Sequence, residues 1–282
     1  MMNVPKSRES AKWYVTLLGS IHATNCKDDN DRVNTFRTTK CESLFAYLVY
    51  KKPFILKGKD LRERIAYDIW EDSDLDNDVI TRRLTTELNW LRDTFGHDVF
   101  PPHSKDIVCD FLQGGNLLAR SFSTDAGYWI NTQVPEARRS QDLVLLGDTV
   151  INYSGQFAPG LSEAWAECER TKLELAFTEI LVKLANLLWQ SGDLRHREEC
   201  LRLLEDSKIK FAQGLDCHQA FLETYLRVHQ QNNDTTAKLQ AIAVVKDIRV
   251  SRYPLSDELY EIVCELGATR EANDYMSVYG GT

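Results

Sequence analysis

The sequence lacks the features that mark a membrane-spanning or exported protein. No apolar stretch approaches the roughly 18 residues that a transmembrane helix needs, so no contact with a membrane is expected. Residues 1–12 are polar, lack the apolar core of a secretion signal and are expected to form a flexible N-terminus. These absences leave the cytoplasm as the expected location.

Cysteine usage argues against a disulfide framework and a metal site. The seven cysteines are odd in number and contain no C-x-x-C pair, so we expect reduced and mostly buried thiols. Histidines and cysteines show no ligand spacing, and no metal is expected. The acidic segment at residues 71–78 lacks the glycine and the distal glutamate of a calcium loop, which favours a helix-capping linker.

Enzymatic motifs are also missing. The chain has no G-x-S-x-G elbow, no G-x-G-x-x-G turn and no H-E-x-x-H helix. A phosphate-binding loop ending at Gly58 and Lys59 is excluded because Pro53 stands where its first glycine is required. The six histidines are isolated from obvious partners. We therefore predict that the protein is not an enzyme and has no catalytic residue and no cofactor.

What the sequence does contain is a strongly amphipathic segment at residues 77–96. Its apolar residues recur at steps of four, four, three and four, which gathers them into one stripe of a helix. The stripe consists of Ile80, Leu84, Leu88, Leu91 and Phe95. Asp76, Asn77 or Asp78 is expected to start this helix, because Asp and Asn suit N-caps.

The polar side of the same helix carries residue types that read DNA. Arginine can bond guanine bidentately, asparagine can bond adenine, and a threonine methyl can contact thymine. The side opposite the stripe presents Arg82, Thr86 and Asn89, with Arg83 and Trp90 on one flank and Thr85 and Arg92 on the other. We therefore assign these residues to DNA binding in a major groove.

The surrounding pattern is that of a winged helix-turn-helix. Helices are expected at residues 41–50 and 59–70, and β-rich runs at 13–23 and 32–36 predict a small sheet before them. After the amphipathic helix, runs at 107–112 and 116–122 flank a glycine pair and predict a hairpin, the wing. From this wing, Lys105 or Arg120 is expected to reach a phosphate.

The start of the helix at 41–50 is a second candidate contact with DNA. Thr38 or Thr39 is available as its N-cap, and Glu42 follows Thr39 by three residues, as in a capping box. Helix N-termini favour anions. Thr38, Thr39 and Lys40 are therefore predicted to contact the DNA backbone.

The net charge of -8 belongs to the second half of the chain. Residues 1–100 hold 16 Lys and Arg against 16 Asp and Glu, and since the whole chain holds 34 against 42, residues 101–282 hold 18 against 26. A neutral DNA-binding half is weakly equipped for phosphate contacts. We therefore expect modest affinity that depends on two or more copies bound side by side.

The second half of the chain is predicted to be helical throughout. Apolar residues at helical spacing and polar or glycine stops predict them at residues 141–153, 162–190, 195–205, 216–230, 235–250 and 256–266. An array of helical hairpins normally offers a face to a protein partner. No clean 34-residue repeat of the tetratricopeptide kind is visible.

Several segments of the chain resemble those of a known family. LLGS, FRTTK at 36–40, LRERIAYDIW and the amphipathic helix resemble the OmpR-type winged helix of the SARP class of bacterial transcriptional activators. YSGQFAPGLSEAWAECER at 153–170 and RYPLSDELYEIV at 252–263 resemble the start and the closing helix of the bacterial transcriptional activator domain that follows it. The resemblance extends from about residue 13 to residue 266.

The resemblance implies both a fold and a function. The implied fold is an α+β winged helix at residues 13–125 followed by an all-α, tetratricopeptide-like domain at 126–282. The implied function is a sequence-specific activator that binds direct repeats in double-stranded DNA, forms a homo-oligomer there and contacts RNA polymerase. Two alternatives stay open: a protein-interaction scaffold whose winged helix binds no DNA, and a ligand sensor of the same architecture.

Overall fold

The computed structural model describes residues 11–51, 58–71, 76–96, 99–100, 121–210, 219–232, 236–251 and 255–279. The chain divides into two compact units. The N-terminal unit comprises Met1–Gln133 and Tyr153–Leu173, and the C-terminal unit comprises Val134–Asn152 and Glu174–Thr282. The predicted wing at 101–120, with Lys105 and Arg120, lies outside the described residues.

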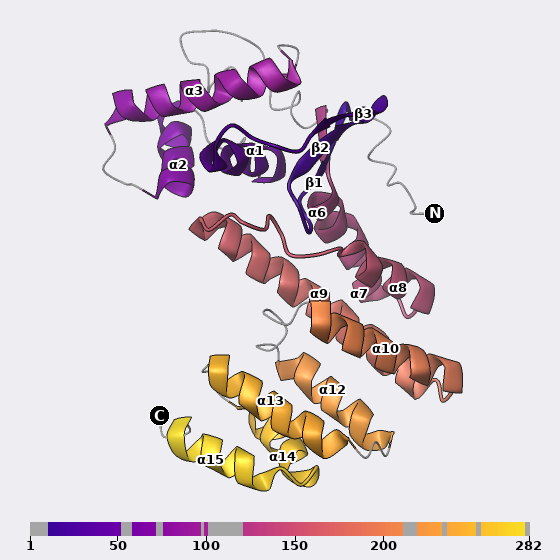
Figure 1. Ribbon diagram of the computed structural model, residues 1–282. Coiled ribbons are helices and arrows are strands. Elements are labelled where there is room, and N and C mark those ends of the chain that lie inside the picture. The colour runs from indigo at the N-terminus through magenta and orange to yellow at the C-terminus, as the bar shows by residue number, and fades with distance from the viewer. Residues whose placement is uncertain are drawn as a thin grey trace. The chain divides into compact units, whose positions relative to one another are not determined.

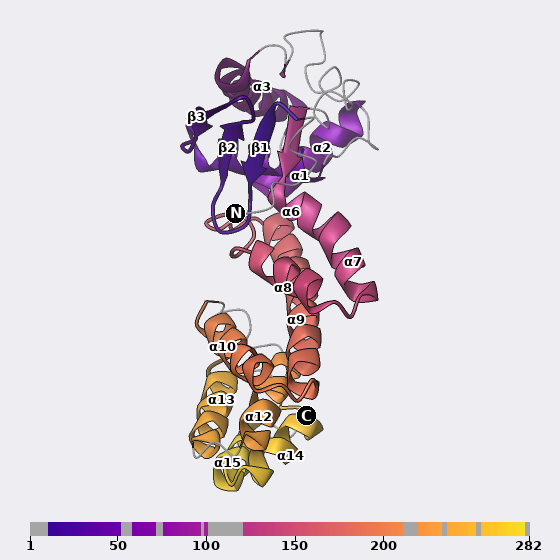
Figure 2. The ribbon, with the colours of Figure 1, turned by 90° about the vertical axis from the view of Figure 1, so that its right-hand side faces the viewer.

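A small mixed sheet forms one side of the N-terminal unit. Its four strands run in the order β3-β2-β1-β4, with β4 parallel to β1 and the other pairs antiparallel (Figure 2). The strands are β1 (Trp13–Thr16), β2 (His22–Asn25), β3 (Asp28–Val33) and β4 (Phe122–Thr124). Trp13, Val15, Ala23 and Phe122 are buried and give the sheet an apolar face.

The sheet confirms the predicted β-region but differs in its detail. The run at 13–23 is divided into β1 and β2, because the chain turns at Gly19, whose φ of 87° is readily adopted only by glycine. The strand predicted at 32–36 lies instead at Asp28–Val33. Most of β3 is exposed and polar, so the strand has no apolar alternation by which it could be recognised.

Three helices pack together beside the sheet. They are α1 (Thr39–Lys51), α2 (Gly58–Trp70) and α3 (Asn77–Phe95), and α3 lies across both α1 and α2 (Figure 1). Of these, α1 and α3 contact the strands of the sheet. Their positions match the predicted helices. Phe45 of α1 stacks on Phe95 of α3 with ring centroids 4.8 Å apart, and both rings contact Phe122 of β4. This aromatic cluster joins the helices to the sheet.

Residues 153–173 return to complete the N-terminal unit. Phe157 bridges to Leu18, and the backbone of Ala158 donates to the oxygen of Leu17 over 2.6 Å. Gly155 passes so close to Gly19 that an added Cβ would lie 2.8 Å from the Gly19 Cα. Residues 153–163 form a strap, and a side chain at Gly155 would push this strap away from the turn after β1. The strap leads into α9 (Ala164–Gln190).

The short helical segments α6 (Asp125–Tyr128) and η2 (Trp129–Gln133), the latter a π-helical stretch, follow β4 in the N-terminal unit. Thr124 caps α6, because its hydroxyl accepts from the backbone N–H of Gly127 over 3.0 Å. Trp129 packs on Tyr153 with ring centroids 4.8 Å apart, which ties this turn to the start of the strap.

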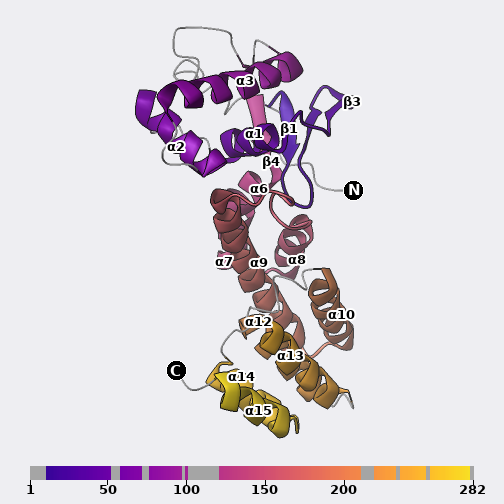
Figure 3. The same ribbon diagram turned by 60° about the vertical axis from the view of Figure 1, so that its left-hand side comes forward.

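The C-terminal unit is helical throughout its described residues. It contains α7 (Val134–Arg139), α8 (Leu143–Asn152), the later part of α9, α10 (Leu194–Lys210), α12 (Gln219–Gln231), α13 (Ala237–Ser251), α14 (Asp257–Glu265) and α15 (Thr269–Tyr279). Helices α12 to α15 pack side by side (Figure 3). The predicted helices are confirmed within a few residues at most of their ends, whereas α7 and α15 are not predicted from the sequence. The tetratricopeptide-like arrangement stays a prediction.

Across the ranges that the structure describes, no helix combines the length and the apolar character needed to cross a membrane.

Candidate nucleic-acid interface

Helix α3 is built as the sequence predicts. Asp76 is its N-cap and accepts from the backbone N–H of Asp78, and Gly96 ends it with a φ of 94°. The predicted apolar stripe is buried throughout, with Ile80, Leu84, Leu88, Leu91 and Phe95 each at most 4% exposed. Burial of the stripe fixes which side of α3 faces outward.

The outward side carries most of the residues assigned to DNA. Arg82, Arg83, Thr86 and Asn89 are exposed, and Thr85 and Trp90 are half-buried. The Thr86 hydroxyl donates to the backbone oxygen of Arg82 over 2.9 Å. The same face also bears exposed acids, Asp78 near its start and Asp93 near its end. This face of α3 therefore presents both hydrogen-bond donors and acceptors, and it carries both positive and negative charges.

Arg92 is turned inward. Its residue is 6% exposed, its Nε donates to the backbone oxygen of Phe100 over 2.9 Å, and its Nη1 donates to the Asn89 side chain. These bonds attach the chain after Gly96 to the last turn of α3. In the structure this arginine holds the helix end and orients Asn89.

Replacing Arg92 with alanine is expected to lower the free energy of unfolding by about 2 kcal/mol, because hydrogen bonds from a buried guanidinium are lost and the Phe100 oxygen stays buried. Arg83→Ala removes an exposed arginine from the same helix and is expected to change stability by less than about 0.5 kcal/mol. Urea unfolding of both variants measures the contrast. Equal losses would show that Arg92 has no special structural role.

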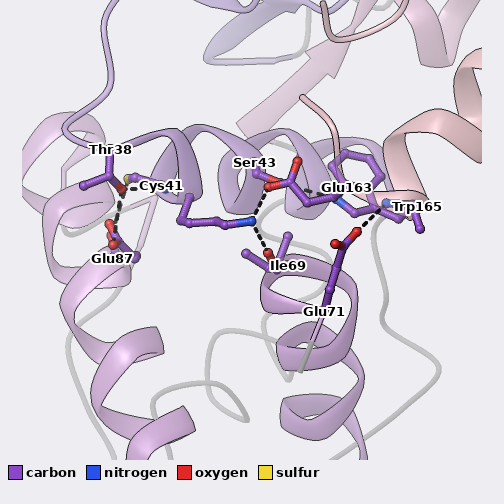
Figure 4. Close-up of polar contacts among 10 residues, drawn as sticks. Thr38, Cys41, Ser43, Ile69, Glu71, Glu87, Glu163 and Trp165 are labelled. Carbon is purple, nitrogen blue, oxygen red and sulfur yellow. Dashed lines mark hydrogen bonds and ion pairs between the residues drawn. The ribbon is translucent and has the colours of Figure 1, made fainter. Parts of the chain in front are cut away.

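Thr38 caps α1 and contacts α3. Its hydroxyl oxygen accepts from the backbone N–H of Cys41 over 2.9 Å and donates to Glu87 Oε1 over 3.3 Å (Figure 4). The cap is therefore Thr38, and Thr39 is the first residue of α1. The other oxygen of Glu87, Oε2, is buried without a hydrogen-bond partner. A carboxylate of the protein itself thus lies beside the helix N-terminus predicted to receive a phosphate.

Lys40 is also engaged inside the N-terminal unit. Its Nζ donates to the Ile69 backbone oxygen over 2.7 Å, at the end of α2, and to Glu163 Oε1 over 2.8 Å (Figure 4). Glu163 is nearly fully buried, with a side chain only 3% exposed. The carboxylate of Glu71, just after α2, accepts a hydrogen bond from the backbone N–H of Ala164 over 2.8 Å. Lys40 therefore ties the start of α9 to α1 and α2.

A second ion pair lies at the other end of α1. Lys51 bonds to Glu169 Oε1, and the Tyr50 hydroxyl donates to Glu169 Oε2 over 3.1 Å. Burial alone would raise the pKa of Glu169, but the hydrogen bond and charge of Lys51 hold it below its usual value. Lys40 and Lys51, the two lysines of α1, are thus paired with Glu163 of the strap and Glu169 of α9. Near the first of these pairs, burial and the charge of Glu163 raise the pKa of Glu42.

Sequence reasoning missed Glu71, Glu87, Glu163 and Glu169 as partners. Glu163 and Glu169 lie more than a hundred residues from the lysines that they meet, so no local pattern signals the pairing. Within the described ranges, no group of three or more His, Cys, Asp or Glu side chains is placed to hold a metal ion.

The architecture is a small mixed sheet with α1, α2 and α3, followed by a helical unit. No protein-family model matches the chain, and no curated protein matches it. Among solved structures, it is similar to EmbR of Mycobacterium tuberculosis, solved in complex with a low-affinity phosphopeptide. The two chains are 12% identical, with a TM-score of 0.57 over 96% of this chain and 69% of EmbR. The chain therefore has an EmbR-like fold, which supports the SARP-like fold predicted from the sequence.

Proposed function

We propose that this protein is a sequence-specific DNA-binding transcriptional activator of the SARP type. The single observation that carries the proposal is the outward face of α3, where Arg82, Arg83, Thr86 and Asn89 are exposed opposite a fully buried stripe. Among the described residues, the side chains of Arg82 and Arg83 form no ion pair or hydrogen bond. Both guanidinium groups are therefore available to a ligand.

In the proposed complex, α3 enters the major groove. Arg82, Thr86 and Asn89 approach base edges, and Arg83 approaches a phosphate. Thr85, Trp90 and Thr39 lie at the margins of this contact, and the Lys105 wing would reach an adjacent groove. Arg92, Thr38 and Lys40 have internal partners and would act by holding α3, α1 and α9 in position.

The C-terminal unit would join copies of the protein on direct repeats and contact RNA polymerase. This part of the proposal is supported by the sequence resemblance and by the EmbR-like fold. An array of packed helices also presents long side-by-side faces of the kind that protein partners use.

A protein-interaction scaffold is the second candidate function. It is favoured by the loss of positive charge from the surface, since Lys40 and Lys51 are paired with Glu163 and Glu169 and Arg92 is buried. A weak positive field reduces the nonspecific affinity from which DNA recognition starts.

Selection of bound duplexes from a random pool at moderate salt separates the two functions. Enrichment of one sequence is expected, and Arg82→Ala and Asn89→Ala should each lose about 1–3 kcal/mol of binding free energy and relax preference at one base position. Arg195→Ala, which removes an exposed arginine of α10, serves as the matched control and should bind like the wild type. A pool that shows no enrichment with the wild type would favour the scaffold.

A further inference from the structure

We propose that Arg37 is a DNA-backbone contact, held beside the recognition helix α3 by its two chain neighbours. The inference rests on the proposed function and adds a phosphate contact from outside α3. The basic residues near α1 differ in whether they have a partner within the protein. Lys40 and Lys51 are paired with buried acids, whereas Arg37 is exposed and makes no ion pair or hydrogen bond among the described residues.

Two contacts fix the backbone on either side of Arg37. Phe36 packs on Trp90 of α3 with ring centroids 5.6 Å apart. Thr38 donates its hydroxyl proton to Glu87 of α3 over 3.3 Å. The residue between them cannot move far from α3 without breaking one of these contacts, so Arg37 is positioned by packing as well as by chain connectivity.

The contacted residues define the flank of α3 that Arg37 adjoins. Glu87 and Trp90 are three residues apart, and Arg83 precedes Glu87 by four, so all three lie along one side of the helix. Arg83 is exposed on that side. Arg37 and Arg83 therefore supply two unpaired positive charges next to the same edge of the recognition face.

The charge of Arg37 also reaches the first turn of α1. Burial and the charge of Glu87 raise the pKa of the Cys41 thiol, and the nearby Arg37 charge opposes that rise. The guanidinium group thus lies near the N-terminus of α1, where Glu87 contacts Thr38. Because the Glu87 carboxylate already lies beside the N-terminus of α1, we assign the anion contact in this region to Arg37.

A guanidinium group suits this task because its planar donors can bond two phosphate oxygens at once. Phosphates line both edges of the major groove, so a residue beside the recognition helix meets backbone rather than bases. The expected role of Arg37 is to fix the position of α3 on the duplex without reading sequence.

The test measures the affinity of the full chain for the selected duplex and for a scrambled duplex over a series of salt concentrations. Arg37→Gln is expected to weaken both complexes by a similar factor of ~10 and to reduce the salt slope by about 1. Arg37→Lys keeps the charge but loses the bidentate geometry, so it is expected to recover part of the affinity. Arg139→Gln, at an exposed arginine of α7, should stay within about twofold of the wild type.

Three results would overturn the assignment. Unchanged binding by Arg37→Gln, loss confined to the selected duplex, or an Arg37→Lys variant no tighter than Arg37→Gln would each exclude a phosphate contact. A wild-type protein that binds neither duplex would instead overturn the proposed function, and the assignment with it. Thermal unfolding of each variant checks that the exposed substitution leaves the fold intact.

Discussion

Replacing Trp165 with alanine is expected to destabilise the N-terminal unit by about 3–5 kcal/mol, the usual cost of removing a buried tryptophan. Trp165 lies in the first turn of α9, far along the chain from the sheet and helices that it stabilises. It is 6% exposed, and it meets the Tyr47 ring edge-on at 5.2 Å. Its loss would therefore leave a cavity against α1.

The expected loss is large because Trp165 also has a polar role. Its indole Nε1 donates to the Ser43 hydroxyl over 3.3 Å, and Ser43 is fully buried (Figure 4). Alanine removes this donor together with the ring contacts to Tyr47 and Phe157. A buried hydroxyl that loses a partner adds its own cost to that of the cavity.

Hydrogen exchange of the α1 backbone amides measures the effect where it is expected. The matched control is Trp189→Ala near the other end of α9, which makes the same change in the same helix. Trp189 is half-buried, packs under Arg197 and bonds to Gln231, so its loss should act within the C-terminal unit and leave α1 protection unchanged. Equal loss of α1 protection in both variants would contradict a specific role for Trp165.

The N-terminal unit, to which we assign the proposed DNA binding, includes residues 153–173. The strap and the start of α9 supply Trp165, Glu163 and Glu169 to α1, and Phe157 to the turn after β1. A fragment that ended at residue 125, the predicted domain boundary, would lack all four. The structure thus gives a physical reason to include residues up to 173 in any fragment made for DNA binding.

The sequence predicted well what depends on neighbouring residues. The spacing of Ile80, Leu84 and Leu88 alone determines which side of α3 is apolar, and all three are buried. Asp76 was among the predicted caps for the same local reason, since its side chain needs only the next turn. Periodicity and capping act within a few residues, so they can be read from sequence.

What could not be predicted depends on distant partners. Arg92 lies on the border between the apolar and polar sides of α3, and its burial follows from the return of the chain to Phe100. Lys40 has the positive charge that a phosphate contact needs. Its Nζ nevertheless bonds to Glu163, because the strap folds back against α1. Residue type and helical position specify what such a side chain can bind, and the tertiary fold decides which partner it meets.

Asp125 carries the second large expected effect, on the pH dependence of stability. Its carboxylate lies at the junction of β4 and α6 and holds the chain after β1. Oδ1 accepts from the backbone N–H groups of Leu17 and Ala126 over 2.7 and 2.6 Å, and Oδ2 accepts from Leu18 over 3.1 Å. Burial nevertheless outweighs these bonds and raises the pKa of Asp125 from 3.8 to about 6.

The sign of the effect follows from proton binding. Between about pH 4 and pH 6, native Asp125 keeps a proton that the unfolded chain has released, so the free energy of unfolding falls as pH rises through this window. A rise in the pKa from 3.8 to about 6 corresponds to about 3 kcal/mol. Stability contributed by the proton is therefore fully present below about pH 4 and lost above about pH 6.

Asp125→Asn removes this titration while keeping one oxygen for Leu17 and Ala126, although its amide would face the N–H of Leu18. Urea unfolding of both proteins from pH 3 to pH 7 is expected to show the stability advantage of the wild type shrinking by about 3 kcal/mol. Asp148→Asn makes the same change at an exposed position on α8 and should leave the pH profile of the wild type unaltered. An advantage that grew with pH would mean that the three N–H bonds, rather than burial, govern Asp125, and would reverse the assigned direction of its pKa.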